Sequence, residues 1–578
     1  MNNNPIGGSG YPTGYASQQP VNPAYQPPVQ SVPQPVRPVY QPPAPMPPVV
    51  KQASAHTAAA KNAVGSMNKA LFVLLSVLFG WICSRSLLSL ETGIGITVMG
   101  LAFYLIYIPF IVFRQEKKIP LMGWLLFIPQ ILLLASFAFF SDIRVTLIGL
   151  LASFLIATVQ TTLIANCTTG EPFSFDLICD TCITYLALPL MNFITTFTGI
   201  FPGKDKSGKG DKTSLKIAIG AAISLPVVLV LITLFAISDE MFARLVQKLL
   251  DVLNLNLARI AADVILTLIV MLYIMPLVVS LRSGYRKQYN HKESRRFLDP
   301  IISATVMFAS SVVYLAFVAV QFTYLFAGSG NLPEGLTLAE YSRRGFFELV
   351  FVIVITSIVI GAVCVLTKNN KHDKLPVYLK VALLIIAASN VVMTVSAARR
   401  LVIYIANYNM TVSRFNAAVM IALMAIVDIV VALRIIFDHL KVSAVVGSVL
   451  ALTAAGYCLF NVNGFVAKYN IDQYLADNAK YKIDIEYIAE DLSVAAIPQL
   501  ERLMNTAPDE LTKEHAKLAI ANIALRQNLF EGDEHHIARW TIDRQVAIDI
   551  VDKYEITEAM ADEYFDRFIS SYSSYRDL

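Results

Sequence analysis

Long apolar stretches, separated by short polar connections, make up most of the chain between Ala70 and Asn461. Their lengths lie near the ~20 residues that a helix needs to cross ~30 Å of hydrocarbon. Because lipid offers backbone groups no other partners, we expect an all-α fold, a polytopic transmembrane helical bundle. The pattern predicts eleven spans, at about 70–90, 94–113, 120–141, 145–166, 217–237, 261–281, 299–326, 345–367, 375–398, 415–437 and 442–461.

Two further stretches are interpreted as helices at the membrane surface. Residues 176–201 are apolar enough to span, but counting them would put the later basic loops on the wrong side of the membrane. We expect an interfacial or re-entrant helix there. Residues 238–260 show leucines at helical spacing with charged residues between them, which is typical of an amphipathic helix. The transmembrane domain, with both of these helices, is assigned to 67–461.

The two ends of the chain follow other patterns. Residues 1–66 have no apolar periodicity and are rich in Pro, Gln and Tyr, so we expect a disordered cytoplasmic leader. Its repeated YQPP fits a polyproline ligand for a protein partner, although the composition favours a flexible tether. Residues 462–578 turn polar and helical, which predicts a C-terminal acidic helical domain that could also bind a protein partner.

Composition and charge place the chain in a membrane and orient it. The chain is 56% hydrophobic and only 15% charged, so membrane lipids are its expected surroundings. Lys and Arg outnumber Asp and Glu by 34 to 20 up to Asn461, but 12 stand against 22 beyond it. Basic residues gather in alternate loops, which the positive-inside rule places in the cytoplasm. We therefore expect a multi-pass protein of the cell membrane with a cytoplasmic N-terminus and an extracytoplasmic C-terminal domain.

A dense polar segment marks the start of the span at 345–367. Thr337 and Glu340 form a capping box, in which each side chain satisfies an orphan backbone N–H at the helix start. We expect an outer-leaflet cluster that locks the bundle or binds a ligand, with Arg85 as a partner for Glu348. Its members are Thr337, Glu340, Tyr341, Arg343, Arg344, Glu348, Arg399 and Arg400.

Asp428 lies well inside the span predicted at 415–437. An ionisable side chain in lipid is costly, so it marks either a functional site or a static partner for a cation on a neighbouring helix. Asp428 is therefore the candidate ion site.

The search for catalytic and metal motifs is negative. The chain has no P-loop, H-E-x-x-H or G-x-S-x-G pattern. Cys179 and Cys182 have C-x-x-C spacing without a second ligand pair, so we interpret the cysteines as small buried residues. The run Asp533 to His536 is interpreted as a solvated turn. We expect no catalytic residue, metal, cofactor or nucleic-acid partner.

Three ordered elements carry a family resemblance. They are LPEGLTLAEYSRRGFFEL at 332–349, RRLVIYIANYNMTVSRF at 399–415, and FNVNGFVAKYNIDQY at 460–474 followed by KIDIEYIAEDLSVAAIPQL at 482–500. They resemble the signature elements of a bacterial multi-pass membrane family catalogued as a domain of unknown function. The resemblance implies a variable leader, a polytopic bundle and a soluble helical C-terminal part, and it implies no catalytic residue. Asn409 stands where that family often has glycine.

Three functions fit these observations. The first is an envelope sensor, scaffold or regulatory partner that uses the C-terminal domain and the outer loops. The second is an ion-coupled transporter with Asp428 at its centre, although Pro189, Pro226 and Pro276 show no matching broken helices in two halves. The third is a membrane enzyme acting on phosphate-bearing lipid or envelope polymer through the outer arginines. We lean against an enzyme because no nucleophile or base stands out.

Overall fold

The computed structural model describes most of the chain beyond Ala58. The described ranges are 58–88, 93–112, 119–168, 175–200, 257–284, 298–326, 346–368, 374–438, 440–530 and 539–569, with single positions between 228 and 244. Within these ranges the secondary structure is helical and contains no strand. Ten described helices are long and apolar enough to cross a membrane. The predicted all-α polytopic bundle is confirmed.

A first group of helices comes from the N-terminal half. α2 packs on α3 and α11, and α5 joins α3 to α6. Its core is apolar and aromatic, with Phe72, Tyr107 and Met275 fully buried. The members are α2 (Lys69–Leu88), α3 (Ile94–Val112), α4 (Leu121–Leu125), α5 (Phe127–Phe139), α6 (Ile143–Ile164) and α11 (Leu257–Ser283).

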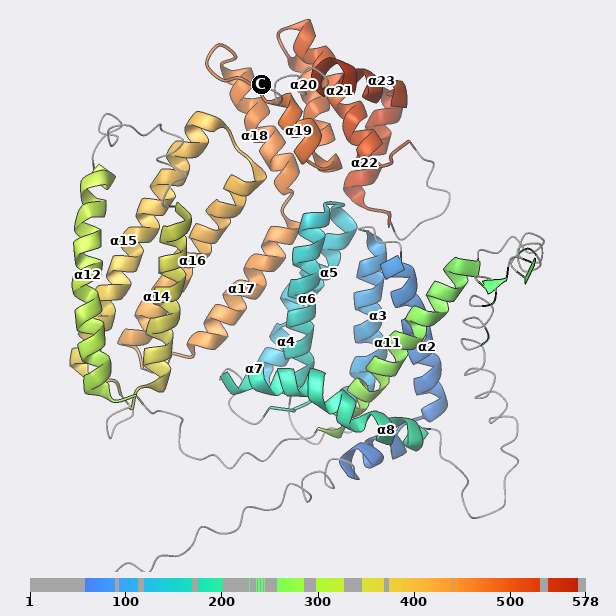
Figure 1. Ribbon diagram of the computed structural model, residues 1–578, viewed down its shortest axis with the longest axis vertical. Coiled ribbons are helices and arrows are strands. Elements are labelled where there is room, and N and C mark those ends of the chain that lie inside the picture. The colour runs from blue at the N-terminus through green and yellow to red at the C-terminus, as the bar shows by residue number, and fades with distance from the viewer. Residues whose placement is uncertain are drawn as a thin grey trace, which may run out of the picture. The chain divides into compact units, whose positions relative to one another are not determined.

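One helical segment of this half runs across the ends of the others (Figure 1). It consists of α7 (Phe175–Cys182), the π-helical turn η1 (Ile183–Ala187) and α8 (Leu188–Ile200). Residues 177–200 are long and apolar enough to span a membrane. In the structure, however, α8 packs on α11, and the Lys69 ammonium donates to the Gly199 carbonyl at 2.6 Å. Its position at the membrane surface stays a prediction.

A second group follows, in which α15 contacts the three other helices. These are α12 (Pro300–Phe326), α14 (Phe346–Leu366), α15 (Val377–Tyr408) and α16 (Val412–Ile436). α17 (Val442–Leu459) lies between the two groups, against α5 and α6 on one side and α16 on the other (Figure 1).

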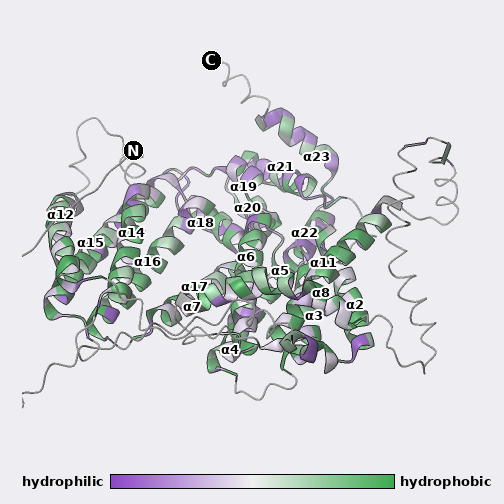
Figure 2. Cartoon of the chain, turned by 60° about the horizontal axis from the view of Figure 1, so that its bottom comes forward, coloured by the Kyte–Doolittle hydropathy of each residue, from purple (hydrophilic) through white to green (hydrophobic). Residues whose placement is uncertain are grey.

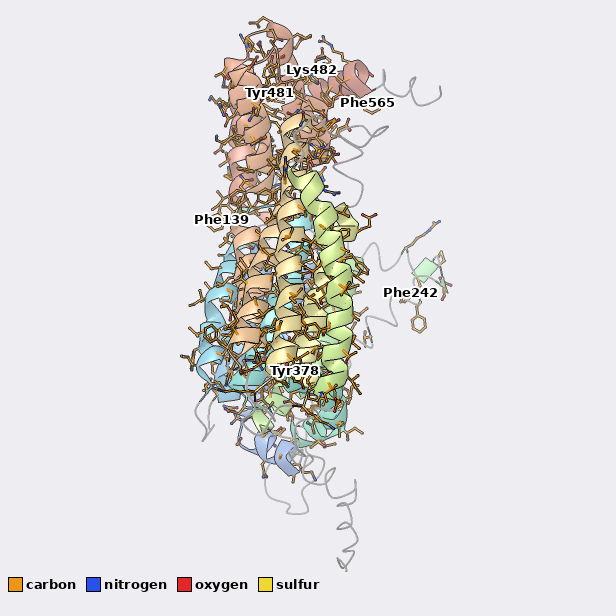
Figure 3. The ribbon with its side chains drawn as sticks, turned by 90° about the vertical axis from the view of Figure 1, so that its left-hand side faces the viewer. Phe139, Phe242, Tyr378, Tyr481, Lys482 and Phe565 are labelled. Carbon is orange, nitrogen blue, oxygen red and sulfur yellow. The ribbon has the colours of Figure 1, made fainter. Side chains whose placement is uncertain are left out.

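α15 is longer than a membrane requires. At 1.5 Å per residue its 32 residues extend about 48 Å, against ~30 Å of hydrocarbon. The sequence predicts a membrane span at 375–398, and the helix extends beyond it. The helix continues because Leu401 is buried against α16 and Ile405 packs on the core of the C-terminal domain. Figure 3 shows Tyr378, near the start of α15, far from Lys482 of that domain.

The C-terminal helices form a domain with its own core. α21 is its central helix and packs on α19, α20, α22 and α23. Figure 2 shows more hydrophilic residues on α21, α22 and α23 than along the bundle. The elements are α18 (Val462–Ala476), α19 (Ile485–Asp491), η2 (Val494–Ala496), α20 (Ile497–Thr506), α21 (Glu510–Arg526), α22 (Ile542–Lys553), α23 (Glu558–Tyr564) and η4 (Phe565–Ile569).

Helices cover ten of the eleven predicted spans. The remaining prediction, at 217–237, and the amphipathic helix predicted at 238–260 lie almost wholly outside the described residues. The leader predicted at 1–66 is also outside them, except for its last residues.

Close contact between α2 and α11 generates the first testable prediction. A Cβ atom at Gly80 would lie 2.7 Å from the Thr267 carbonyl oxygen of α11, which is backbone and cannot rotate away. We expect Gly80→Ala to lower the free energy of unfolding by about 1 to 3 kcal/mol, the usual cost of overpacking. The measurement is thermal unfolding of the purified protein in detergent.

Gly361→Ala is the matched control, because a Cβ atom there meets nothing within 4 Å. Both substitutions gain the same helix propensity. The two variants therefore differ in packing, and equal melting temperatures would contradict the close approach.

Candidate functional site

A carboxylate is buried inside the second group of helices. Asp428 of α16 is 3% exposed, and three neutral side chains contact it. The Ser357 hydroxyl of α14 lies 2.9 Å from Oδ1, and the Asn390 amide nitrogen of α15 lies 3.2 Å from the same oxygen. The Thr394 hydroxyl of α15 donates to Oδ2 at 3.1 Å. We call Asp428, Ser357, Asn390 and Thr394 the carboxylate site.

Helical spacing brings these groups together. Asn390 and Thr394 are four residues apart and so share one face of α15. Ser357 and Asp428 lie near the middle of their own helices. Ile353, Met393 and Met424, all nearly or fully buried, form an apolar cluster beside the site. The carboxylate is therefore surrounded by apolar packing, and among the described residues its polar contacts come from the three neutral side chains alone.

Two membrane carboxylates of the protein have opposite surroundings. Asp263 of α11 forms an ion pair with Arg85 at 3.2 Å and accepts a hydrogen bond from Ser84 at 2.6 Å. Asp428 has no electrostatic interaction with a charged group among the residues that the structure describes. The described contacts therefore do not support the alternative that Asp428 is the static partner of a cation on a neighbouring helix.

The outer polar cluster falls mostly outside the described residues, since they omit Thr337, Glu340, Tyr341, Arg343 and Arg344. Of the described members, Glu348 is exposed in the first turn of α14, and Arg399 and Arg400 are partly buried on α15. The Arg400 guanidinium donates to the side-chain amide oxygen of Gln321 on α12 at 3.4 Å. The cluster as a whole stays a prediction. Arg85, offered by the sequence as a partner for Glu348, pairs with Asp263 instead.

The cysteines correct one expectation. Cys83, Cys167, Cys364 and Cys458 are buried as expected, but Cys179 and Cys182 are exposed. Both lie on α7, three residues apart on one helix face, while α7 packs on α6. The described residues contain no group of three or more metal-ligating side chains, and the run Asp533 to His536 lies outside them.

A second polar region joins the bundle to the C-terminal domain. Here the loop between α15 and α16 enters the domain. The Met410 N–H donates to the Asn470 side-chain oxygen at 2.8 Å, and the Asn470 amide donates back to the Met410 carbonyl at 2.9 Å. The Val412 N–H donates to the Tyr487 hydroxyl at 2.9 Å. Met410 and Val412 also belong to the apolar core of the domain.

Local chemistry shapes this loop. Asn409 has a φ of +64° and a ψ of 176°, a conformation that favours glycine. Its side-chain amide donates to the Lys482 carbonyl at 3.0 Å. The Arg414 guanidinium donates to the carbonyls of Tyr408 and Asn409 and lies 4.1 Å from the centre of the Tyr404 ring. The loop is thereby closed on itself before it meets the domain.

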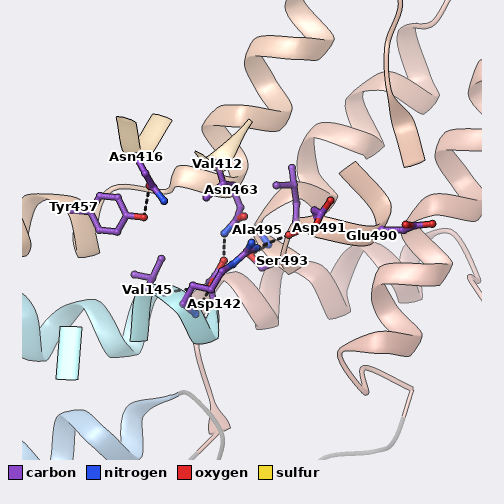
Figure 4. A network of polar contacts seen from close by, with 12 residues as sticks. Asp142, Val145, Val412, Asn416, Tyr457, Asn463, Glu490, Asp491, Ser493 and Ala495 are labelled. Atoms are coloured by element: carbon purple, nitrogen blue, oxygen red, sulfur yellow. Dashed lines mark hydrogen bonds and ion pairs between the residues drawn. The ribbon is translucent and has the colours of Figure 1, made fainter. Parts of the chain in front are cut away.

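The turn between α5 and α6 holds the other side of the domain (Figure 4). Asp142 caps α6 by accepting from the Arg144 N–H at 2.7 Å, and its second oxygen accepts from the Asn463 amide at 2.5 Å. The Arg144 guanidinium donates to the Asp491 carbonyl at 2.5 Å. Asp142 and Asn463 are both buried.

Asp543 of α22 completes this contact. Its carboxylate accepts from the Ser141 N–H at 3.0 Å and from the Thr541 hydroxyl at 2.6 Å. Burial raises the pKa of the Asp543 carboxyl, although these hydrogen bonds oppose the change. The Ile94 N–H at the start of α3 donates to the Trp540 carbonyl at 3.1 Å.

We call the contacts of both loops with the domain the junction. Its residues are Ile94, Ser141, Asp142, Arg144, Asn409, Met410, Val412, Asn463, Asn470, Lys482, Tyr487, Asp491, Trp540 and Asp543. Sequence reasoning assigned no role to most of them. Asn409, Asn470 and Tyr487 stand in the quoted family elements. The residues that Asn470 and Tyr487 bond to in the loop, however, lie 60 and 75 positions earlier in the sequence. Only the fold brings them together.

A bundle of apolar membrane-spanning helices joined to a polar helical domain defines a polytopic membrane protein. The family model described as "Domain of unknown function (DUF4153)" matches residues 127–503, and the chain belongs to this family. The family assignment that the sequence elements indicated is thus confirmed. The match begins in α5 and ends in α20, so it contains the whole carboxylate site and most of the junction. No curated protein and no solved structure matches the chain.

The paired hydrogen bonds of Asn470 generate the second prediction. Asn470 is 4% exposed, so Asn470→Ala leaves the N–H and C=O of Met410 without their side-chain partner in a buried place. We expect a loss of about 2 to 3 kcal/mol of stability. The measurements are thermal unfolding and the rate of proteolysis between α15 and α16.

Asn505→Ala is the control. Asn505 belongs to the same domain and donates to the Tyr554 hydroxyl at 3.0 Å, but it is exposed. Its replacement should change stability by less than about 0.5 kcal/mol. If both variants behaved alike, the junction would not depend on the Asn470 pairing.

Proposed function

We propose that the protein is a sensor or regulatory protein of the cell membrane, in which the membrane helices control the C-terminal domain. One observation carries the proposal. The two helices that supply Asp428, Asn390 and Thr394 are the same two whose connecting loop is part of the core of that domain.

The helices are stiff enough to connect the two places. α15 runs without a break from Val377 to Tyr408, and α16 begins four residues later at Val412. Packed interfaces shift between discrete arrangements rather than deform continuously. A change at the carboxylate site that slides or turns α15 against α16 would therefore move Met410. The N–H and the C=O of Met410 both form hydrogen bonds with the Asn470 side chain.

The domain also contacts the first group of helices. Asn463 and Asp543 hold the turn between α5 and α6, whereas Asn470 and Tyr487 hold the loop between α15 and α16. A relative movement of the two helix groups would act on the domain from both sides. This arrangement supports a role in which the domain responds to the state of the bundle and passes it to a protein partner.

The charge distribution supports an extracytoplasmic position for this domain. Its acidic character and the basic alternate loops of the bundle agree with the positive-inside rule. We accordingly propose an envelope location for the surface that meets a protein partner, and a cytoplasmic location for the leader.

Hydrogen–deuterium exchange tests the proposed coupling. In Asp428→Asn the new NH₂ group replaces one carboxylate oxygen and so meets a donor there, Asn390 at Oδ1 or Thr394 at Oδ2, and the packing of α15 against α16 should loosen. We expect faster exchange in peptides from the α15–α16 loop and from α18, because local opening governs exchange.

Asp263→Asn serves as the comparison, because it disturbs a buried carboxylate of the first helix group. It should leave the α15–α16 loop unchanged. Faster exchange confined to α15 and α16, with α18 unaffected, would refute the regulatory proposal.

An ion-coupled carrier is the second candidate, favoured by the buried Asp428 with three neutral partners. Complementation of a deletion strain separates the two functions. A regulator should lose function in the double variant Asn470→Ala with Tyr487→Phe, which removes three hydrogen bonds between the domain and the α15–α16 loop. A carrier should keep it, since the variant leaves the carboxylate site intact. In either case, Asp428→Asn should fail to complement the deletion strain.

A further inference from the structure

We propose that the carboxylate site binds one exchangeable proton on Asp428, so that the membrane helices sense proton supply. This inference deepens the proposed function by naming the ligand of its membrane site. It follows from a shortage of hydrogen atoms among the polar groups of the site and from the absence of a compensating cation among the described contacts.

The shortage begins at Ser357. Its oxygen lies 3.0 Å from the Ile353 carbonyl and 2.9 Å from Asp428 Oδ1, but a hydroxyl has one hydrogen. A serine within a helix commonly donates to the carbonyl four residues before it, which here is Ile353. The short contact with Asp428 then needs a hydrogen from the carboxyl group itself.

Asn390 shows the same shortage. Its amide nitrogen has two hydrogens but three acceptors nearby, the Ile353 carbonyl at 3.3 Å, the Ser357 oxygen at 3.2 Å and Asp428 Oδ1 at 3.2 Å. Its own oxygen is buried and has no hydrogen-bond partner among the residues that the structure describes, and Asn390 is only 1% exposed. An unsatisfied buried acceptor beside a carboxylate indicates a missing donor.

The Asn390 amide can serve both protonation states. As it stands, its NH₂ group faces the carboxylate and donates to it. Rotation by half a turn would place its oxygen there, so the single hydrogen of a neutral carboxyl group can be donated either to Asn390 or to Ser357. The site therefore offers matched partners to Asp428 with and without a proton, which a static structural carboxylate does not need.

Charges on the packed helices do not replace the proton. Arg434 of α16 interacts electrostatically with Cys364 of α14 and with Asp438, and Lys380 of α15 is paired with Asp438 at 2.7 Å. On α15, Arg400 contacts Gln321, and on α14 Glu348 is exposed. On α17, Tyr457 bonds to Asn416 and Cys458 lies against Val145.

None of these groups is hydrogen-bonded to Asp428, and no charged one interacts with it electrostatically among the described residues. A bare carboxylate in such surroundings is costly. A bound proton removes that charge and supplies the missing donor in one step.

Infrared difference spectroscopy tests the inference on the full-length protein in lipid bilayers. The buffer is changed between about pH 5 and about pH 9, a range in which an ordinary Asp carboxyl is ionised throughout. We expect a carboxyl C=O band that disappears at alkaline pH, is absent in Asp428→Asn and returns in Asp428→Glu. In Thr394→Val the band should move to higher frequency, since a hydroxyl that contacts the carboxyl group is lost.

Two results would overturn the inference. The first is a band assigned to Asp428 that does not change with pH, or no such band at any pH. The second is a band that disappears at constant pH when sodium replaces potassium, which would make the ligand an alkali cation. The outcome of the hydrogen–deuterium exchange test of the proposed function is independent of this result. Asp428 could take up a proton without affecting α18, and α18 could respond to Asp428→Asn without Asp428 ever binding a proton.

Discussion

The rest of the structure depends on the insertion of the α15–α16 loop into the C-terminal domain. Met410 is at once the turn between two membrane helices and a buried residue of a polar domain. Asn470 satisfies both its N–H and its C=O, so neither backbone group of Met410 is unpaired where it enters an apolar core. Without that pairing the loop would still contact the domain through Asn409 and Val412, but the buried backbone groups of Met410 would lose their side-chain partner. With it, the position of the domain is set by the helices themselves.

Desolvation explains why the two membrane carboxylates cannot have the same role. Asp263 lies beside a cation, which offsets the cost of its charge, so its role as a structural pair is complete. Among the described residues Asp428 has hydroxyl and amide partners only, none of which cancels the charge of a carboxylate. The first arrangement stabilises one state of the helices. In the second arrangement, around Asp428, the state of the helices depends on the positive charge that the site receives.

Sequence alone predicted the membrane helices well, because the hydrocarbon length and the need for internal backbone hydrogen bonds leave few choices. It also singled out Asp428, since a carboxylate within an apolar run is unusual. It could not find Ser357 or Asn390, because neutral polar residues are common in such helices and only packing selects the three that meet. The extension of α15 beyond the span predicted at 375–398 was likewise not predictable, since contacts with a distant domain extend the helix past Arg400.

The junction was the least predictable part, and its chemistry shows why. Asp142 is an ordinary helix cap in sequence, yet one of its oxygens reaches Asn463 more than 300 residues later. A cap needs only one carboxylate oxygen, so the second is free to hold another element. Asn470 and Tyr487 likewise bond to backbone groups of the loop, and such contacts leave no pattern in the partner's sequence. A domain held through caps and backbone groups can therefore be anchored firmly while the anchoring residues look unremarkable in the chain.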